Sequence, residues 1–166
     1  PVSEMITGLD LVKEQIKVAR GEKLSITQDD LKINGHCIEV RVCAEDPTNN
    51  FLSDIRNIKT YRIPSGPGVR VDDSFEEGMD IPIFYDPMIA KLIVHGKDRT
   101  EAIEKMLRAI QDYTITGVET DFEKMQVYPN PAHRIFFLRS IYLTRVRCIL
   151  LYDTNGRSVD FEARQL

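Results

Sequence analysis

An alternating segment in the first third of the chain indicates how this protein folds. It reads His36-Cys37-Ile38-Glu39-Val40-Arg41-Val42-Cys43. Successive side chains on a β-strand point to opposite faces of the sheet. One face of this segment would therefore be apolar, with Ile38, Val40 and Val42, and the other partly polar, with Cys37, Glu39, Arg41 and Cys43. The pattern predicts a strand that has one face in a core and Arg41 near the middle of the other face.

Further strands are expected after this segment. Asn57–Ile63 is a candidate strand, Val69–Val71 is a short one, and Met88–His95 is longer and rich in branched residues, with Gly96 closing it. The glycines and prolines of Pro64–Gly68 predict a tight loop. Short turns between strands favour antiparallel pairing, because parallel strands need long crossover connections.

A helix is expected at the N-terminal side, over Ser3–Arg20. Apolar residues recur there at three- and four-residue spacing, which makes one stripe along a helix: Met5, Leu9, Val12, Ile16 and Ala19. Ser3 is a suitable N-cap, and Gly21 follows as a stop signal.

A second helix is expected over Arg99–Tyr113. Its predicted buried face consists of Ala102, Ile103, Met106, Ala109, Ile110 and Tyr113. Asp98 lies at the capping position and Glu101 follows three residues later, as in a capping box. The order of helix, strands and helix predicts an α+β domain, with an antiparallel sheet flanked by helices, rather than a doubly wound α/β sheet.

Composition excludes several broad classes of protein. The 166 residues are 42% hydrophobic and 29% charged, with a formal net charge of −4. A negative chain has no general attraction for nucleic acid or anionic membranes, and no apolar run is long enough to cross a bilayer. The three cysteines, Cys37, Cys43 and Cys148, form no CxxC pair. An odd count without such a pair argues against a disulfide framework or a zinc site, and favours a reducing, cytoplasmic location.

The composition changes near residue 120. Up to Thr120 there are 15 Lys and Arg against 21 Asp and Glu, a balance of −6; from Asp121 onward there are 7 against 5, a balance of +2. A shift of this kind can mark a boundary. We therefore expect one domain over residues 1–120 and a separate, divergent tail over 121–166.

Two places could carry chemistry. Arg41 would place a permanently charged, five-donor guanidinium centrally on a strand, which suits a carboxylate, a phosphate or a developing anionic oxygen. A salt bridge to a neighbouring acid on an exposed sheet face explains the same pattern. Asp86, in the run Tyr85-Asp86-Pro87-Met88, could orient an arginine or simply form a turn. The histidines His36, His95 and His133 are interpreted as structural or solvated.

Five segments resemble the biotin carboxylase family, in family order. Pro1–Val12 is similar to the segment that follows the family's Glu-His pair. Gly35–Pro47 resembles its G-H-A-I-E-x-R-(I/V)-x-A-E-D-P motif, and Pro64–Arg70 resembles its P-x-G-x-G-V-R turn. Tyr85–Leu92 resembles Y-D-(S/P)-M-(I/L)-A-K-(L/V), and Arg99–Val118 continues the match. Similar segments occur in acetyl-CoA, propionyl-CoA, methylcrotonyl-CoA and pyruvate carboxylases, so the final carboxyl acceptor is left open.

The resemblance implies an ATP-dependent ligase that carboxylates N1 of biotin with bicarbonate. It implies that Arg41 stabilises negative charge on the ureido oxygen of biotin, a role that fits an always-charged, two-pronged donor. It implies that Asp86 lies near the active site and near a contact between subunits, and that Arg70 lies near biotin and in a dimer region. Implied partners are an upstream ATP-grasp part, a biotin carboxyl carrier domain and a second copy in a homodimer.

Two departures from the family shape the expectations. The family residues that hold ATP, the Mg²⁺ ions and bicarbonate lie upstream of the motifs present here, so we expect the 166-residue chain by itself to be inactive. The resemblance ends near Thr120, for which a shifted reading frame, a mis-joined gene or genuine divergence are the alternatives. A non-catalytic assembly or dimerisation domain that retains the fold is the alternative to the enzyme hypothesis.

Overall fold

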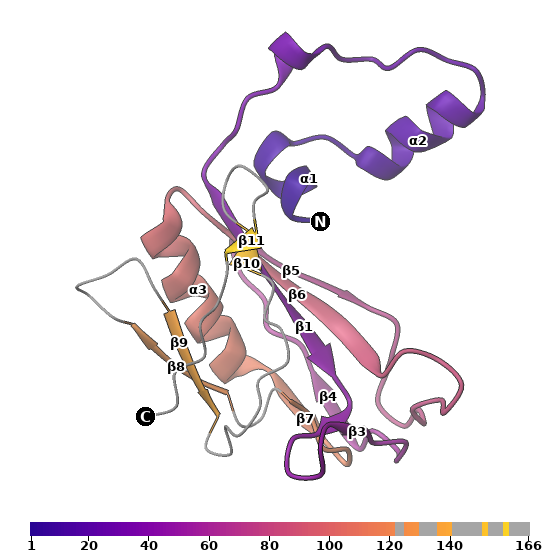
Figure 1. The fold of residues 1–166 in the computed structure, drawn as a ribbon, viewed down its shortest axis with the longest axis vertical. Helices are drawn as coiled ribbons and strands as arrows, with labels where there is room; N and C mark the ends of the chain where they lie inside the picture. Colours follow the sequence, from indigo (N-terminus) through magenta and orange to yellow (C-terminus); the bar gives the residue numbers. More distant parts are fainter. Residues whose placement is uncertain (122–124, 130–135, 141–150, 153–157, 160–166) are drawn as a thin grey trace.

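A computed structural model describes residues 1–121, 125–129, 136–140, 151–152 and 158–159 (Figure 1). In chain order the elements are α1 (Val2–Thr7), α2 (Leu11–Ala19), the 3-10 turn Gln28–Asp30, β1 (His36–Cys43), β2 (Glu45–Asp46), β3 (Leu52–Ser53), β4 (Thr60–Arg62), β5 (Val69–Asp73), β6 (Met88–Gly96), α3 (Arg99–Asp112), β7 (Thr114–Thr116), β8 (Met125–Pro129), β9 (Phe136–Ser140), β10 (Leu151–Tyr152) and β11 (Ser158–Val159). The predicted α+β class is confirmed.

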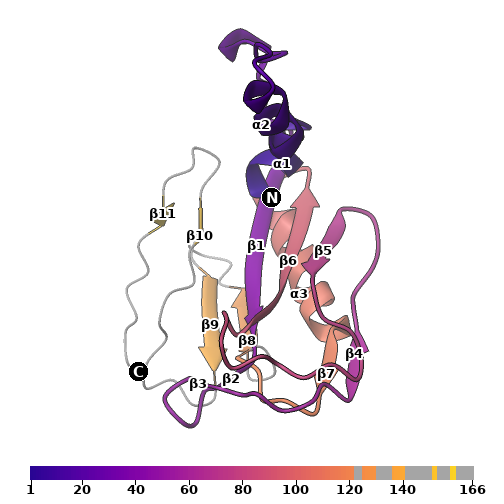
Figure 2. The same cartoon turned by 90° about the vertical axis from the view of Figure 1, so that its right-hand side faces the viewer.

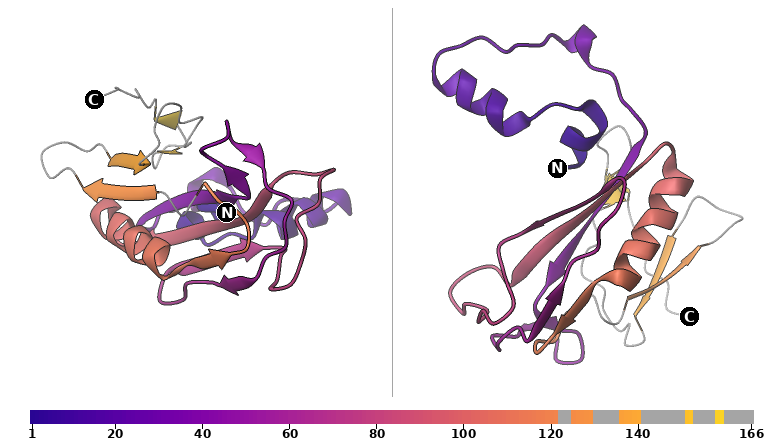
Figure 3. Two further views of the ribbon diagram at one scale, coloured as in Figure 1. Left: turned by 90° about the horizontal axis from the view of Figure 1, so that it is seen from below. Right: turned by 180° about the vertical axis from the view of Figure 1, so that it is seen from behind.

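A three-stranded antiparallel sheet forms the centre of the described fold. Its strand order is β1-β6-β5, so β6 pairs on both sides. Helix α3 lies along one face of this sheet, as the view from below shows (Figure 3). Strands β4 and β7 pair separately and antiparallel at the end of the sheet near the C-terminus of α3. The predicted antiparallel pairing is therefore confirmed.

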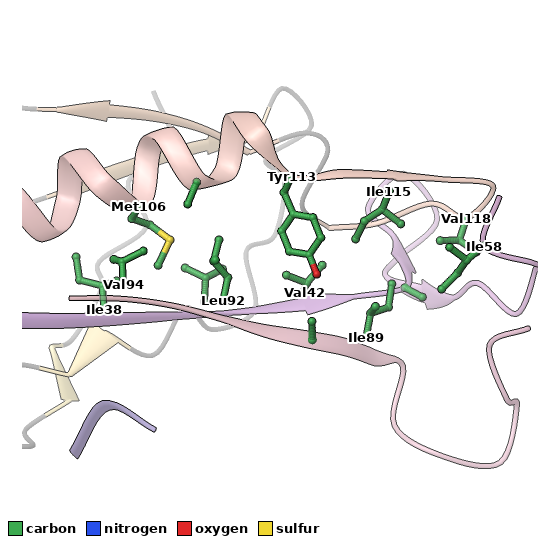
Figure 4. Packing of buried hydrophobic residues seen from close by; sticks show 14 of the residues in the cluster. Ile38, Val42, Ile58, Ile89, Leu92, Val94, Met106, Tyr113, Ile115 and Val118 are labelled. Carbon is green, nitrogen blue, oxygen red and sulfur yellow. The ribbon is translucent and has the colours of Figure 1, made fainter. Parts of the chain in front are cut away.

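The core lies between α3 and the apolar face of the sheet (Figure 4). Val42, Leu92 and Val94 are fully buried there. They pack with Ala102, Met106, Ala109 and Tyr113 of the helix side, and Ile103 and Ile110 are partly buried against the same cluster. The predicted buried faces of β1 and α3 are confirmed. The alternating apolar residues of the strand pack against the apolar stripe of the helix in one cluster.

The capping of α3 follows the expected residues with one change. The Asp98 carboxylate accepts a hydrogen bond from the Glu101 N–H at 2.9 Å. The Glu101 carboxylate accepts from the N–H of Lys97 at 2.9 Å, rather than from that of Asp98. The reciprocal arrangement is thus shifted by one residue, and it still satisfies two backbone donors at the helix start.

The single N-terminal helix predicted over Ser3–Arg20 is wrong. Gly8 ends α1 in the left-handed conformation, with φ 72°, and Asp10 begins α2 by accepting a hydrogen bond from the Lys13 N–H at 2.9 Å. A left-handed glycine stops a helix and an aspartate N-cap starts one, so these two residues divide the stripe. No residue of α2 is buried, and α2 extends beyond the end of the sheet (Figure 2).

The remaining strand predictions are confirmed with adjusted bounds. The candidate Asn57–Ile63 contains only β4 as a strand, and Asn57 forms an isolated bridge with Asp80. The loop Pro64–Gly68 is present. A side chain at Gly68 would clash with the His95 carbonyl oxygen, so only glycine fits at this position.

The tail lies mostly outside the described residues. Of its described residues, β8 pairs with β9 and β10 pairs with β11, both antiparallel. His133, interpreted as structural or solvated, and Cys148 lie outside the described segments. The boundary at residue 120 stays a prediction. In the described part of the chain, no helix combines the length and the apolar character that a membrane span requires.

Candidate active site

Arg41 lies on the face of the sheet that points away from α3. Its neighbours Val40 and Val42 are buried in the core, whereas Arg41 itself is exposed. Directly opposite Arg41 on β6 is Lys91, which lies between the buried residues Ala90 and Leu92. Within the described residues the Arg41 guanidinium has no hydrogen bond or ion pair. The salt bridge that could have explained its position is therefore not found in this part of the chain.

Helix α1 covers one end of the same face. Ile6 packs with Cys37 and Ile93 there, which explains why these two residues of the polar face are buried. The backbone nitrogen of Pro1 lies 3.5 Å from the Glu39 carboxylate. The part of this face that α1 leaves uncovered therefore begins after Glu39, at the cross-strand pair of Arg41 and Lys91.

Arg70 lies on the same face of the sheet as Arg41, but on the other outer strand and level with Glu39. It lies on β5, the third strand of the sheet, and pairs in register with Ile93. Its guanidinium donates to the Asp72 carboxylate at 2.6 and 2.8 Å and to Glu4 of α1 at 3.4 Å. The hydrogen bond to Asp72 raises the pKa of Arg70. In this chain Arg70 fastens α1 to the sheet, and its predicted place near biotin or in a dimer region stays a prediction.

Asp86 lies in the loop two residues before β6 begins at Met88. Its carboxylate accepts a hydrogen bond from the Met88 N–H at 2.8 Å, which is the turn geometry anticipated for this residue. The pKa of the Cys43 thiol is raised to about 12, first by burial and then by nearby carboxylates that include Asp86, while the charge of Arg41 lowers it. Arg41 and Asp86 therefore act on one place, the Cys43 end of β1.

A β-bulge separates the two halves of this region. Val42 pairs with Ala90, but Cys43 pairs with Met88, so β6 contains one extra residue, Ile89. Bulges increase the local twist and often re-aim side chains beside active sites. This one lies immediately after the pair formed by Arg41 and Lys91.

Three site residues were missed by the sequence patterns. Lys91 could have been found, because it alternates with apolar neighbours as Arg41 does. Glu45 follows β1, and burial, then the charge of Asp86, raises its pKa. Asp121 gives no local signal, because its partner is 78 residues away: its carboxylate accepts from the Cys43 N–H at 2.9 Å. In the described segments, no group of His, Cys, Asp and Glu could hold a metal ion.

The half-buried carboxyl group of Asp121 predicts a pH effect on stability. Burial raises its pKa to about 7, whereas in the unfolded chain an Asp pKa is about 3.9. Between these values the unfolded chain loses the proton first, so this group lowers the free energy of unfolding as the pH rises from about 4 to about 7. Asp121→Asn keeps an acceptor for Cys43 and removes the titration, so the variant is expected to gain stability over the parent only at the higher pH.

Urea unfolding of both proteins at about pH 4 and about pH 8 measures this difference. An equal difference in the free energy of unfolding at both pH values would show that the Asp121 proton is not linked to folding.

Comparison with known sequences agrees with the motifs. The profile of the biotin carboxylase C-terminal domain matches residues 39–131, which extends past the predicted boundary at residue 120. The carbamoyl-phosphate synthase L chain, ATP binding domain matches residues 1–27. One of the pyruvate carboxylase subunits of Methanothermobacter thermautotrophicus is 43% identical over 166 residues, which cover 100% of this chain and 32% of that protein. Biotin carboxylase 1 of Bacillus subtilis is 52% identical over 120 residues, 72% of this chain and 27% of that protein.

Comparison of structures gives the same result. The biotin carboxylase domain dimer of Hydrogenobacter thermophilus 2-oxoglutarate carboxylase, solved with MgADP, ADP and bicarbonate, superposes with a TM-score of 0.72 at 44% identity. The match covers 74% of this chain and 27% of that one, so the chain spans about a third or less of the length of these relatives. Since the profile matches more than half of the residues, the chain belongs to the biotin carboxylase C-terminal domain family.

Proposed function

We propose that this chain is the C-terminal part of a biotin carboxylase and that Arg41 binds the ureido oxygen of biotin. The observation that carries the proposal is the position of Arg41: central on a rigid strand, exposed, and without an ion-pair partner among the described residues. A buried or paired arginine could not offer its donors to a ligand. Within the described residues, none of the five donors of this guanidinium is taken up by another group.

The geometry suits an oxygen that gains negative charge. Biotin, when bound, supplies the ring nitrogen that accepts the carboxyl group. The guanidinium of Arg41 stays charged at any working pH, and its planar fork can donate two hydrogen bonds to one acceptor group. Pairing with β6 and the core beneath β1 fix the backbone position from which the Arg41 guanidinium extends, and a donor held at a set place on the protein can stabilise developing charge.

The N-terminal segment supports a contact with an ATP-grasp part. Residues 1–27 match an ATP-binding domain, and α2 within them exposes Leu11, Val12, Ile16 and Val18. An exposed apolar helix face of this kind marks an interaction surface. ATP and Mg²⁺ would be held by that upstream part, which agrees with the MgADP in the related 2-oxoglutarate carboxylase domain. No step involving them is assigned to the residues of this chain.

The same comparisons support a proposal for the wider assembly. The related domain crystallised as a dimer, and we extend a homodimer and a biotin carboxyl carrier domain to this protein as proposed partners. The acceptor is left open: one relative belongs to a pyruvate carboxylase, and a place in acetyl-CoA carboxylase and fatty acid biosynthesis stays a prediction, as does a cytoplasmic location.

A chimaera tests the proposal. Residues 1–120 of this chain would replace the matching 120-residue segment of the Bacillus subtilis biotin carboxylase, which is 52% identical. We expect the chimaera to cleave ATP in a biotin- and bicarbonate-dependent manner and to carboxylate free biotin. The 166-residue chain alone should show neither activity, because the ATP-handling residues lie upstream.

The outcomes separate the two functional hypotheses. A folded, dimeric chimaera without activity would favour the non-catalytic assembly domain. The native Bacillus subtilis enzyme is assayed in parallel, and its activity shows that an inactive chimaera is not caused by a fault in the assay.

A further inference from the structure

We propose that Gly8 is a hinge between α1 and α2, and that Glu4, bound by Arg70, is the latch that fixes the direction of α2. Glu4 and Arg70 are then positioning residues. They set where α2, and an upstream part that docks on it, lies relative to the face that carries Arg41. The effect on catalysis rests on the proposed function, whereas the latch itself is a property of the isolated chain.

Helix α1 is fixed to the sheet, although it lies in the segment that matches an ATP-binding domain. Its Ile6 packs with Cys37 and Ile93 of the sheet, and the Ile6 carbonyl oxygen accepts a hydrogen bond from the Asn34 N–H at 2.8 Å. Helix α1 contacts both β1 and β6. The part of the chain that is anchored to the sheet therefore includes α1, and the boundary toward α2 lies inside the matched residues 1–27.

Gly8 has the properties of a hinge. It ends α1 with φ 72°, in the left-handed region that glycine adopts readily. Nothing lies within 4 Å of the position that a Cβ would take, so the surroundings leave room for a change of its backbone angles. No residue of α2 is buried, and α2 extends away from the sheet (Figure 1). Packing among the described residues therefore does not fix the direction of α2.

The Glu4 carboxylate joins the two sides of this hinge to the sheet. Its Oε1 accepts a hydrogen bond from the N–H of Leu11, the first residue of α2, at 2.9 Å. Its Oε2 accepts from the Arg70 guanidinium of β5 at 3.4 Å. The first N–H groups of a helix have no partner within the helix, and a negative charge is favourable at that end. Glu4 therefore stabilises one direction of α2.

The second acid at the start of α2 does not bridge the hinge. Asp10 accepts a hydrogen bond from the Lys13 N–H and lies 3.2 Å from the Lys13 ammonium. These contacts join α2 to its own N-cap, so they move with the helix. Within the described residues, the bond from Leu11 to Glu4 is the one side-chain hydrogen bond that connects α1 with α2.

Asp72 positions Arg70 for the contact with Glu4. It accepts hydrogen bonds from Nε and Nη2 of Arg70 at 2.6 and 2.8 Å, and Nη1 donates to Glu4. The side chains of Arg70 and Glu4 are 41% and 18% exposed, and an ion pair of this exposure adds little stability. Removing the latch should therefore change the direction of α2 without unfolding the domain.

Residual dipolar couplings of the backbone N–H groups measure the latch in the 166-residue chain. In the parent chain, we expect the couplings of α2 to fit the same alignment as those of α1 and β6. In Arg70→Met and in Glu4→Met, the α2 couplings should shrink about twofold or more, because a segment that reorients freely averages its couplings. The couplings of α1 and β6 should stay unchanged, and the double variant should show no further loss.

Three outcomes would overturn the proposal. The first is a set of α2 couplings that neither single variant changes. The second is a parent chain in which the α2 couplings are already averaged, since no latch would then act. The third is a loss of the α1 couplings together with those of α2, since the hinge would then not lie at Gly8.

Arg62→Met is the matched control. Arg62 is an exposed strand arginine of β4 and forms no ion pair within the described part of the chain, so its loss removes the same charge without touching Glu4. The α2 couplings of this variant should equal those of the parent chain. Arg70→Lys keeps a positive charge opposite Glu4 and should restore part of the lost couplings. Equal thermal unfolding midpoints in all variants would show that the domain stays folded.

The chimaera separates this inference from the proposed function. Arg70→Met should lower kcat for biotin carboxylation and leave the KM for ATP unchanged, because ATP would be held upstream. If the chimaera is inactive while the α2 couplings of the isolated chain depend on Arg70, the proposed function fails and the latch stands. If the chimaera is active and Arg70→Met changes neither the α2 couplings nor kcat, the latch fails and the proposed function stands.

Sedimentation of the variant chimaera tests the other predicted role of Arg70, in a dimer region. A lower kcat with an intact dimer and averaged α2 couplings supports the latch. A lower kcat that accompanies dissociation into monomers, with unchanged α2 couplings, would assign Arg70 to the subunit contact and overturn the latch.

Discussion

Replacing Arg41 with methionine in the chimaera is expected to lower kcat for biotin carboxylation about 100- to 1000-fold, equivalent to roughly 2.7–4 kcal/mol of transition-state stabilisation. The reason is the loss of donors fixed on a rigid strand at the place where negative charge develops. Because Arg41 is exposed and unpaired in the described fold, the substitution removes no hydrogen bond or ion pair among the described residues, so the effect is expected in the rate and not in stability.

Two measurements complete this test. Arg41→Lys keeps the positive charge but loses the planar fork, so an activity between those of methionine and arginine is expected. Thermal unfolding of all three proteins should give closely similar midpoints. A methionine variant that carboxylates biotin at the parental rate would remove Arg41 from the chemistry.

Leu92→Ala is expected to lower the free energy of unfolding by about 2–5 kcal/mol. Leu92 is fully buried, lies on the central strand of the sheet and packs in the cluster beneath α3. The substitution removes three carbon atoms from a site closed on both sides by strands and above by a helix. The surrounding residues cannot collapse fully into the space, so a cavity adds to the lost hydrophobic contacts.

Urea unfolding of the 166-residue chain measures this effect, with the midpoint expected to fall at an unchanged slope. Leu24→Ala is the matched control, because Leu24 is exposed and the substitution removes the same atoms outside the core. A similar loss of stability in both variants would contradict the assignment of the core to the layer between α3 and the sheet.

Much of the sheet and its core could be predicted because their signals are local. Alternation along β1 identified the buried face and left Arg41 on the opposite one, and the stripe of α3 identified the residues that cover the sheet. The break at Gly8 was missed because a stripe of apolar residues continues through it, whereas the backbone conformation of one glycine decides where α1 ends.

The positions of the candidate site residues could be predicted in part, for a related reason, and their roles stay predictions. The motifs identified Arg41 and Asp86, which the fold brings to the Cys43 end of β1. They also joined Arg70 to these residues. Its hydrogen bonds to Asp72 stay within β5, but its hydrogen bond to Glu4 joins β5 to α1 and could not be derived from spacing. The contact of Asp121 with Cys43 crosses 78 residues and has no signature in the sequence.

The arm formed by α2 gives the chain two levels of thermodynamic stability. Because no α2 residue is buried, this helix can melt and re-form without exposing any part of the core between α3 and the sheet. Helices this short are marginally stable in water without packing. Amide hydrogens in α2 should therefore exchange with solvent through local opening, whereas those of β6 should exchange only through global unfolding. Any partner that covers α2 would therefore supply the cooperativity that the isolated chain lacks at this end.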